Sequence, residues 1–344
     1  MSTIKEIAKI TGVSIGTVDR ALNNRGRVSE ATREKVLKAA GEIGYTTNIF
    51  ARNLKLSKVY NFSIIMPRPD NDSSYWKIPM EGIEKGVKDL GHYKLKTEFF
   101  LYDKYSPESI SKSFNKAVKN KCDGMIIAPA GENRFEKLLS LIPEGTPYVF
   151  FDSLVPDTPY LSYIGQDAYA SGASAARLMN LVCGSNSRLA VLNFAPEDYH
   201  IEQRTKGFCS YFKSEGEQAP EVFEICPDYK RNLTKCLDAL FEKPGGRIKG
   251  LFVTNASTYL VAGYLKKRKL ENKVTLIGYD LIKENVKYLK EGIIDFIISQ
   301  MSERQGYESV RMLVSKVVLK QEVKRKKYMQ IDIITKENVD YYQS

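Results

Sequence analysis

Apolar side chains near the start of the chain recur at helical spacing and predict a short first helix. Ile4, Ile7 and Ala8 fall on one face of this helix, and the charged residues between them point away from it. Thr3 can cap its start, because Glu6 follows three residues later and completes a capping box. The pattern therefore predicts a helix that begins after Thr3 and buries one face.

A second short helix is expected directly after the first. Gly12 breaks the first pattern, Ser14 is placed to cap the next helix, and Val18 and Leu22 give that helix an apolar edge. Ser29 then begins a third helix, whose apolar face closes a small core. Two short helices joined by a tight turn are typical of a helix-turn-helix, whose second helix enters the DNA major groove.

After residue 60 the pattern changes to short apolar runs that alternate with amphipathic helices. Such runs are typical of strands buried on both faces, and the βαβα alternation indicates parallel doubly wound sheets. The series restarts after Gln166–Asp167, so we expect two α/β lobes with a cleft between them. The expected strands are 62–67, 96–102, 124–130, 147–153, 188–194, 221–226, 250–255, 273–280, 296–300 and 329–335; the expected helices are 78–90, 106–119, 135–141, one ending at 181, 202–215, 232–242, 258–268 and 303–316.

The chain is long enough for two or three domains, and its charge is unevenly spread. It has 344 residues and a formal net charge of +11. Residues 1–58 hold eleven Lys and Arg against five Asp and Glu, whereas the remainder holds 41 against 36. About a sixth of the chain therefore carries over half of the excess charge, which favours a polyanion-binding end.

The cysteines and the hydropathy of the chain predict a cytoplasmic protein without a membrane segment. Five scattered cysteines without CxxC spacing are typical of free thiols in a reducing compartment. Charged residues interrupt the N-terminus, so no signal peptide is expected. No run approaches the ~20 apolar residues of a membrane span.

The sequence argues against an enzyme, a metal site and a cofactor. His92 and His200 are the two histidines, and neither lies in an HExxH motif or beside a metal-ligand partner. No Walker loop, GxSxG elbow or GxGxxG segment follows an expected strand. Asp152 and Asp280 could together do acid–base work, but hydrogen bonding in a ligand-gripping cleft is the simpler explanation.

The segment from Thr3 to Leu54 resembles the DNA-binding headpiece of the LacI/GalR family of bacterial transcription regulators. The match includes all three expected helices and the NIFARNL segment that follows them. The resemblance implies a small all-α helix-turn-helix headpiece (1–46), a hinge helix or linker (47–58) and a two-lobed α/β body (59–344) of the periplasmic-binding-protein type I fold.

In that fold the chain crosses between the lobes three times. The resemblance therefore places the first lobe at about 59–162 and 291–321, and the second at about 163–290 and 322–344. It returns Phe296–Lys316 to the first lobe and assigns Met329–Thr335 to the second. The basic run Lys324–Lys327 lies between these segments, and we interpret it as a solvated loop of charge and not as a nucleic-acid patch.

Three residues of the second helix match or adjoin the positions that read DNA bases in the family. Ile15 can contact a thymine methyl group, Gly16 occupies the next variable position, and Arg20 can bind guanine bidentately. Asp19 departs from the family, in which a serine is usual, so the operator sequence should differ there. Residues suited to phosphate contact and positioning are Thr3, Ser14, Thr17, Asn23 and Arg27.

The hinge segment is implied by the resemblance alone. In the family this segment becomes helical when two subunits lie side by side on DNA, and its leucine wedges into the minor groove. Leu54 matches that leucine, and side-chain wedges of this kind kink the duplex. A flexible linker whose leucine packs on the body is the alternative. The expected hinge contacts are Asn48, Ala51, Arg52 and Leu54.

Polar and aromatic residues follow the carboxyl ends of several expected strands, where ligands bind in open α/β sheets. An aromatic platform with carboxylate, amide and guanidinium groups suits a sugar, which presents CH faces and hydroxyls. Asp152 or Asp280 could instead cap a helix, and Trp76 could anchor its loop. The family's effector-binding positions fall on Tyr75, Trp76, Asp152, Arg204, Asn255, Asp280 and Gln300.

Together these inferences predict a homodimeric transcription regulator, most simply a repressor, that binds a pseudo-palindromic double-stranded DNA operator. Two-fold symmetry places its half-sites about one helical turn, ~10 base pairs, apart. A small effector, a sugar or sugar derivative, is expected to control operator affinity. One alternative is the same architecture sensing a nucleoside, a purine or a sugar phosphate, and a remote one is a sugar-processing enzyme fused to a DNA-binding domain.

Overall fold

The structure, a computed structural model, describes residues 3–22, 26, 28–43, 58–70, 74–194, 197–225, 229–243 and 247–342. The chain divides into two compact units, Met1–Lys58 and Val59–Ser344. The phosphate contacts expected at Asn23 and Arg27, and the hinge contacts expected at Asn48, Ala51, Arg52 and Leu54, lie outside the described residues.

The first unit holds three helices, α1 (Ile4–Thr11), α2 (Ile15–Leu22) and α3 (Glu30–Glu42). The Thr3 hydroxyl accepts from the backbone N–H of Glu6 (3.3 Å), and the Glu6 carboxylate accepts from the backbone N–H of Thr3 (2.8 Å), which completes the expected capping box. The predicted helix-turn-helix is confirmed, and its small core consists of Ile7, Val18, Ala21, Val36, Ala39 and Ala40.

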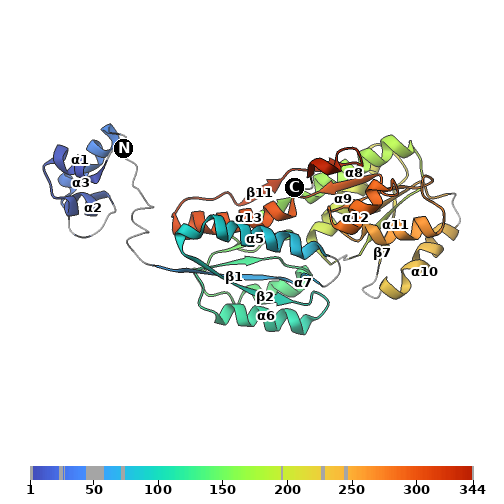
Figure 1. Ribbon diagram of the computed structural model, residues 1–344, viewed down its shortest axis with the longest axis horizontal. Helices are drawn as coiled ribbons and strands as arrows, with labels where there is room; N and C mark the ends of the chain where they lie inside the picture. The colour runs from blue at the N-terminus through green and yellow to red at the C-terminus, as the bar shows by residue number, and fades with distance from the viewer. Residues whose placement is uncertain are drawn as a thin grey trace. The chain divides into compact units, whose positions relative to one another are not determined.

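The first lobe of the body is a parallel sheet of six strands in the order β11-β5-β4-β3-β1-β2. Its helices cover both faces: α5 and α13 pack on one side, and α6 and α7 pack on the other (Figure 1). The elements are β1 (Tyr60–Pro67), β2 (Leu95–Tyr102), β3 (Gly124–Ile127), β4 (Tyr148–Phe151), β5 (Ser162–Gln166), β11 (Lys326–Met329), α5 (Lys77–Asp89), α6 (Pro107–Lys119), α7 (Glu132–Leu139) and α13 (Ser302–Leu313).

The second lobe repeats this plan in the strand order β12-β10-β9-β8-β6-β7, with β12 antiparallel to β10. Helices α8 and α9 pack on one face, and α10, α11 and α12 pack on the other. The elements are β6 (Leu189–Asn193), β7 (Glu221–Glu224), β8 (Gly250–Val253), β9 (Thr275–Tyr279), β10 (Phe296–Ser299), β12 (Asp332–Ile334), α8 (Ala168–Cys183), α9 (Tyr199–Ser214), α10 (Tyr229–Glu242), α11 (Thr258–Lys267) and α12 (Lys283–Lys290).

The structure corrects the expected path of the chain between the lobes. Strand β10 pairs with β9 and β12, so the segment expected to return to the first lobe at about 291 stays in the second lobe until Gln300. The first lobe also extends beyond 162, because β5 pairs with β4 and β11. Each correction arises because a strand's partner is chosen by long-range pairing, which the apolar pattern of the strand does not encode.

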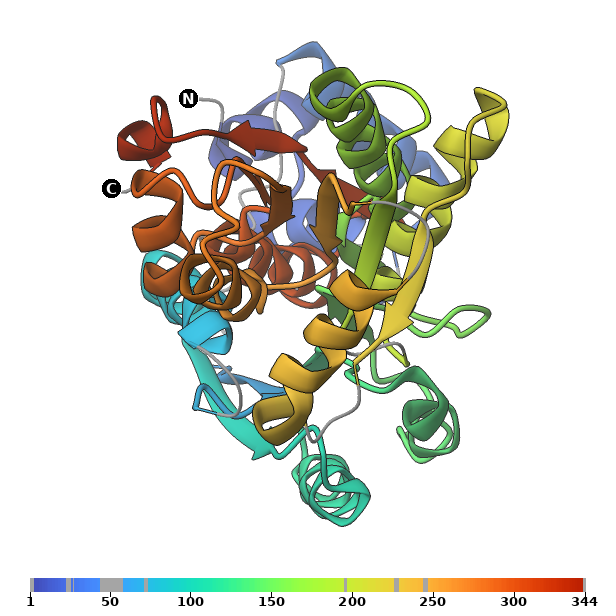
Figure 2. The same ribbon diagram turned by 90° about the vertical axis from the view of Figure 1, so that its right-hand side faces the viewer.

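The expected strand 329–335 corresponds to β12, which joins the second lobe as expected, whereas a separate strand, β11, ends at Met329 and belongs to the first lobe. β11 pairs with β5 in the first lobe, and β12 pairs with β10 in the second. Lys326 and Lys327, expected in a charged loop, lie on edge strand β11, where Lys327 pairs with the buried Glu308 (2.6 Å). The chain end, drawn red in Figure 2, returns to the second lobe, where Lys290 pairs with Asp340 (2.6 Å).

In each lobe two helices cross at a point where only glycine fits. A Cβ on Gly82 of α5 would lie 1.9 Å from the backbone oxygen of Glu303 in α13, and one on Gly306 would lie 2.1 Å from that of Pro79. Helices α8 and α9 cross in the same reciprocal way, through Gly172 and Gly207. The backbones of each pair therefore touch directly.

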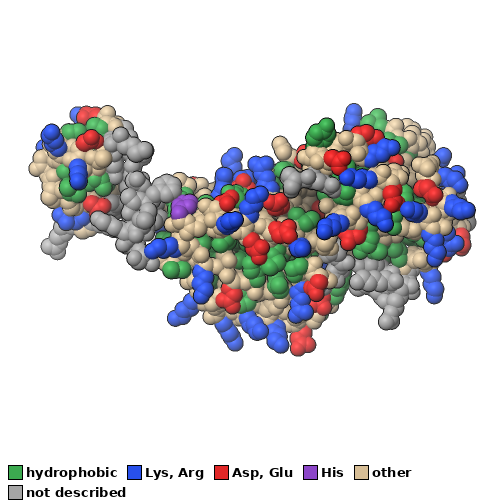
Figure 3. All heavy atoms as spheres, in the orientation of Figure 1, with side chains coloured by type: hydrophobic (Ala, Val, Ile, Leu, Met, Phe, Trp, Pro, Cys, Tyr) green, Lys and Arg blue, Asp and Glu red, His purple; other side chains and the backbone are tan. Residues whose placement is uncertain are grey.

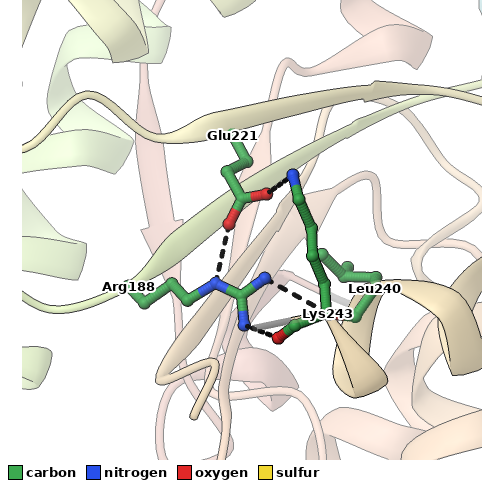
Figure 4. A network of polar contacts seen from close by, with 4 residues as sticks. All are labelled: Arg188, Glu221, Leu240 and Lys243. Atoms are coloured by element: carbon green, nitrogen blue, oxygen red, sulfur yellow. Dashed lines mark hydrogen bonds and ion pairs between the residues drawn. The ribbon is translucent and has the colours of Figure 1, made fainter. Parts of the chain in front are cut away.

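A buried arginine connects strand β7 and the end of helix α10 at the edge of the second lobe (Figure 4). Arg188, which precedes β6, pairs through Nε with Glu221 of β7 (2.7 Å) and donates to the backbone oxygens of Leu240 (3.4 Å) and Lys243 (3.0 Å). Lys243 Nζ also contacts Glu221 (2.6 Å). The guanidinium thus satisfies carbonyl groups at the C-terminus of α10, which an arginine favours by its charge.

Basic and acidic side chains alternate over the face of the body shown in Figure 3. Mixed charge of this kind contrasts with the basic excess counted in residues 1–58. Among the residues that the structure describes, no helix combines the length and the apolar character that crossing a membrane would require.

Candidate ligand-binding site

A small cavity of about 40 Å³ lies between the two lobes, at the carboxyl ends of strands from both sheets. All seven residues expected to bind an effector line this cavity, although they come from segments more than 200 residues apart. The complete lining is Tyr75, Trp76, Lys104, Asp152, Asp198, His200, Ile201, Arg204, Asn255, Ala256, Ser257, Asp280 and Gln300.

The first lobe contributes an aromatic wall. Tyr75 and Trp76 belong to the short 3₁₀ helix Ser74–Trp76 that precedes α5, and their rings meet edge to face with centroids 5.0 Å apart. Trp76 also packs edge to face on Phe151 of β4 (6.4 Å). Trp76 therefore both anchors its loop, as the alternative interpretation proposed, and faces the cavity.

Asp152 joins the aromatic wall to the rest of the site. It follows β4 with φ of 66°, and its carboxylate accepts a hydrogen bond from the Tyr75 hydroxyl. Its backbone N–H donates to Oε1 of Gln305 (3.0 Å). Burial raises the pKa of Asp152, although the Tyr75 hydroxyl and the Arg204 charge oppose that rise.

The second lobe contributes a charged wall, at the centre of which lies Arg204. This side chain is fully buried, and α9 brings it over the ring of Tyr279, 3.7 Å from the ring centroid. Nη1 donates to the backbone oxygen of Thr254 (2.7 Å), and Nη2 donates to Oε1 of Gln300 (2.9 Å). Nε is buried without a hydrogen-bond partner in the described part of the chain.

Asp280 follows β9 and faces Arg204 across the same wall. Gln300 Nε2 donates to its carboxylate (3.0 Å) and to the Tyr75 hydroxyl (3.1 Å), so Gln300 links the two walls. Burial raises the pKa of Asp280 to about 7 against the favourable charge of Arg204. The N-cap of α12 is Ile282, and Asp280 makes no side-chain cap there, so its side chain is available to the pocket.

Asn255 holds the loop that follows β8. Its Oδ1 accepts from the backbone N–H of Ser257 (3.0 Å) in a local turn, and the residue also lines the cavity. Asn255 therefore has a local structural role as well as a place in the cavity lining.

Six of the thirteen lining residues were not among the expected ones, and Asp198 and His200 are two of these six. Asp198, at the start of α9, accepts from the backbone N–H of Gly131 across the lobes (2.5 Å), and burial raises its pKa to about 6. Burial and the nearby Arg204 and Lys104 charges lower the pKa of His200, so its imidazole is neutral. His200 and Arg204 are four residues apart on one helix face, and this spacing was the available signal.

A second, wider cavity of about 840 Å³ lies beside the first and shares Asp280 with it. Its lining alternates in charge along α5 and the start of α13, with Lys77, Glu81, Lys85 and Glu303 among its residues. The expected aromatic residues, Tyr75 and Trp76, do not line it. The smaller cavity is therefore the one that matches the expected chemistry. Among the described residues, no group of His, Cys, Asp and Glu side chains could hold a metal ion.

The headpiece exposes all three expected base-reading residues. Ile15 is 49% exposed at the start of α2, and Arg20 is exposed one turn later, where Nη2 donates to Thr17 Oγ1 (3.2 Å). Gly16 lies between them, also exposed. The Ser14 hydroxyl accepts from the backbone N–H of Thr17 (3.1 Å), so it caps α2 as expected.

Two family models match the chain, one at each unit. The model of bacterial regulatory proteins of the lacI family matches residues 3–48, and that of a periplasmic binding protein domain matches residues 62–321. Over 350 residues the chain is 25% identical to the HTH-type transcriptional repressor PurR of Aliivibrio fischeri, with 98% of each covered.

Two further matches each cover about four fifths of the chain. The chain is 20% identical over 296 residues to the ribose operon repressor of Escherichia coli, with 82% of this chain and 84% of that protein covered. A solved structure assigned as a LacI transcriptional regulator from Bacteroides fragilis is 30% identical, covering 83% of this chain and 100% of that one, with a TM-score of 0.77.

Proposed function

We propose, for a chain that belongs to the LacI family of bacterial regulatory proteins and is thus a DNA-binding transcription regulator, that a carbohydrate bound between its lobes controls operator affinity. The regulator is non-enzymatic, as its family is. The observation that carries the proposal is the pairing of an aromatic wall with a wall of carboxylate, amide and guanidinium groups around one cavity.

Each wall suits one part of a sugar. The rings of Tyr75 and Trp76 offer apolar area to the CH face of a pyranose or furanose. Asp152 and Asp280 can accept hydrogen bonds from the hydroxyl groups of a sugar, and the Nε–H group of Arg204 can donate one to a hydroxyl oxygen. A ligand that carries many hydroxyls and no charge would satisfy these groups together.

The alternative ligands fit the walls less well. A nucleobase is flat and would be held best between two ring faces, whereas the wall opposite Tyr75 is charged. A sugar phosphate would bring its charge near three buried carboxylates, those of Asp152, Asp198 and Asp280, while Arg204 is already engaged by Thr254 and Gln300.

The DNA-binding half of the proposal rests on the headpiece. Two copies of the chain would bind half-sites of a near-palindrome, with Ile15, Gly16 and Arg20 reading bases. Thr3, Ser14, Thr17, Asn23 and Arg27 would contact phosphates or position the headpiece, and Asn48, Ala51, Arg52 and Leu54 would form the hinge in the minor groove. Such a regulator acts on the chromosome, in the bacterial cytoplasm.

Thermal-shift screening of the full-length protein tests the ligand class. We expect neutral sugars to raise the melting temperature, because a ligand at 100 times its Kd stabilises the folded state by about 2.7 kcal/mol. Sugar phosphates, nucleosides and purines serve as the comparison panel. Stabilisation by nucleobases alone would contradict the carbohydrate proposal, and turnover of a stabilising sugar would contradict a non-enzymatic sensor.

Two variants test the DNA assignment. Deletion of residues 1–57 should abolish operator binding and leave the sugar-induced thermal shift in place; retained operator affinity would contradict the headpiece assignment. Arg20→Ala should relax base preference at one operator position by ~1–3 kcal/mol. An equal loss on all sequences would mean that Arg20 contacts phosphate only.

A further inference from the structure

The chain passes between the two lobes at three places, and these crossings lie side by side. β5 ends at Gln166 in the first lobe, and α8 begins two residues later in the second. The second crossing runs from Ser299 at the end of β10 to α13, and the third runs through Gln330 between β11 and β12. Any change in the angle between the lobes must bend all three crossings together.

The buried side chain of Gln166, at the first crossing, contacts both of the other crossings. Nε2 of Gln166 donates to the backbone oxygen of Ser299 (3.1 Å) and to that of Gln330 (2.8 Å). Gln166 is 2% exposed, and it is paired in register with Met329, which adjoins Gln330. The planar amide thus sets the spacing of the three crossings with its two N–H groups.

The buried amide of Gln166 carries a cost in stability that packing alone does not explain. Oε1 of Gln166 is buried and has no hydrogen-bond partner among the described residues. A buried acceptor without a partner lowers stability, whereas an apolar side chain of the same length would fill the space without that loss. The two donated hydrogen bonds are therefore the feature that distinguishes glutamine at this position.

The second crossing leads directly into the pocket. Gln300, next to Ser299, bonds Tyr75 and Asp280 through its side chain. Its backbone oxygen accepts from Nε2 of Gln305 (2.8 Å), whose Oε1 accepts from the backbone N–H of Asp152. A shift of this crossing would therefore move groups in both walls of the pocket.

We propose that Gln166 is a positioning residue of the hinge, whose amide clamps the three crossings in the arrangement that closes the pocket. Without these two hydrogen bonds, the crossings separate more easily and the lobes open more often. The proposal concerns the protein without a ligand, so it stands or falls independently of the identity of the effector.

The single tryptophan of the chain provides the measurement. Trp76 is 6% exposed in the closed pocket, so acrylamide quenching of its fluorescence reports opening of the lobes in the full-length protein. Gln166→Met keeps the length of the side chain and removes both donors. We expect its quenching constant to rise about threefold at 20 °C, as the open population grows. Gln218→Met, at an exposed loop position, is the control and should quench like the wild type.

A second variant separates the loss of donors from any loss of folding. Gln166→Asn keeps both N–H groups but is one methylene too short to reach Ser299 and Gln330 together, so it should also quench more readily. A folded Gln166→Met that melts earlier but quenches like the wild type has lost stability alone and overturns the proposal. If Gln166→Met does not fold, Gln166→Asn decides, and wild-type quenching in that variant overturns the proposal equally.

Discussion

The first lobe presents the rings of Tyr75 and Trp76 to the pocket, whereas the second presents the ionic groups of Arg204 and Asp280. Both lobes are three-layered α/β sheets with a glycine-mediated helix crossing on one face, so the difference does not come from the architecture. It comes from the loops at the carboxyl ends of the strands: those of the first lobe add two aromatic rings beside Asp152, and those of the second lobe carry charged and amide groups.

This contrast teaches how the two walls divide the recognition of a ligand. An aromatic wall contributes contact area with little demand on orientation, whereas buried ionic groups require a partner at a defined angle. The cavity of about 40 Å³ holds little more than water. The proposed sugar would therefore have to part the walls, and the ionic wall would select among patterns of hydroxyl groups.

Removal of the central charge of the second-lobe wall should have the largest effect. Arg204→Ala leaves Asp152 and Asp280 buried without their cation and leaves Gln300 and the Thr254 carbonyl without a donor. We expect a loss of ~3–5 kcal/mol in the free energy of unfolding, measured by chemical denaturation. Arg177→Ala, on the exposed surface of α8, is the control. A loss below ~1 kcal/mol would mean that the ionic wall contributes no more than the aromatic one.

Removal of one hydroxyl from the first-lobe wall should cost less. Tyr75→Phe keeps the ring against Trp76 but removes the donor to Asp152 and the acceptor for Gln300. The expected loss is ~1–3 kcal/mol in the free energy of unfolding. Tyr169→Phe, which is 46% exposed on α8, should be neutral. If Tyr75→Phe costs as much as Arg204→Ala, the division between the two walls is wrong.

The ionic wall should also make stability depend on pH. Burial raises the pKa of Asp280 to about 7, above its value in the unfolded chain, so the folded state binds more protons between pH 4 and 7. The stability that protonated Asp280 contributes is present at pH 4 and is lost as the pH rises through 7, by at most about 1.4 kcal/mol per pH unit. Asp198, with a pKa of about 6, adds to the same slope.

Asp280→Asn should flatten this slope in urea denaturation measured at several pH values. Asp157→Asn is a matched control, because Asp157 is exposed and has a similar positive φ (54° against 71°) that asparagine also tolerates. An unchanged slope in Asp280→Asn would assign the pH dependence to other buried carboxyls.

The smallest effect is expected at the rim of the cleft. Arg134 Nη2 pairs with Glu197 Oε2 (2.9 Å) across the lobes, but both side chains are partly exposed to solvent. Arg134→Ala should change the free energy of unfolding by under ~1 kcal/mol, and less at high salt. Lys206→Ala breaks an exposed pair with Glu202 inside α9 and provides the comparison. A large effect of Arg134→Ala would mean that rim contacts, and not the pocket walls, hold the lobes together.

The features that sequence reasoning predicted well are those written in local periodicity. Apolar runs such as 62–67 located the strands, because a parallel strand that is buried on both faces needs apolar residues at nearly every position. The seven expected effector residues came together because the carboxyl ends of parallel strands meet at one edge of a sheet. Thr3 and Ser29 marked helix starts, since their hydroxyls satisfy orphan amides there.

The features that escaped prediction depend on long-range packing. Short strands such as β10 and β11 carry no mark of which sheet they join, because pairing partners lie more than a hundred residues away in the case of β11. β5 mixes serine, tyrosine and glycine, so its sequence lacks an apolar run. Asp198 and His200 face the pocket only because α9 is held at its crossing with α8.

The glycine crossings have a mechanical consequence. Gly172 lies against the backbone of Arg204 itself, and Gly82 lies against that of Glu303, three residues after Gln300, so each crossing is close in sequence to a residue of the pocket. Helices in backbone contact have no side chains between them at the crossing that could rearrange, so we expect each pair to move as one rigid unit. A displacement that a ligand imposes on the wall should then shift both helices of the pair together.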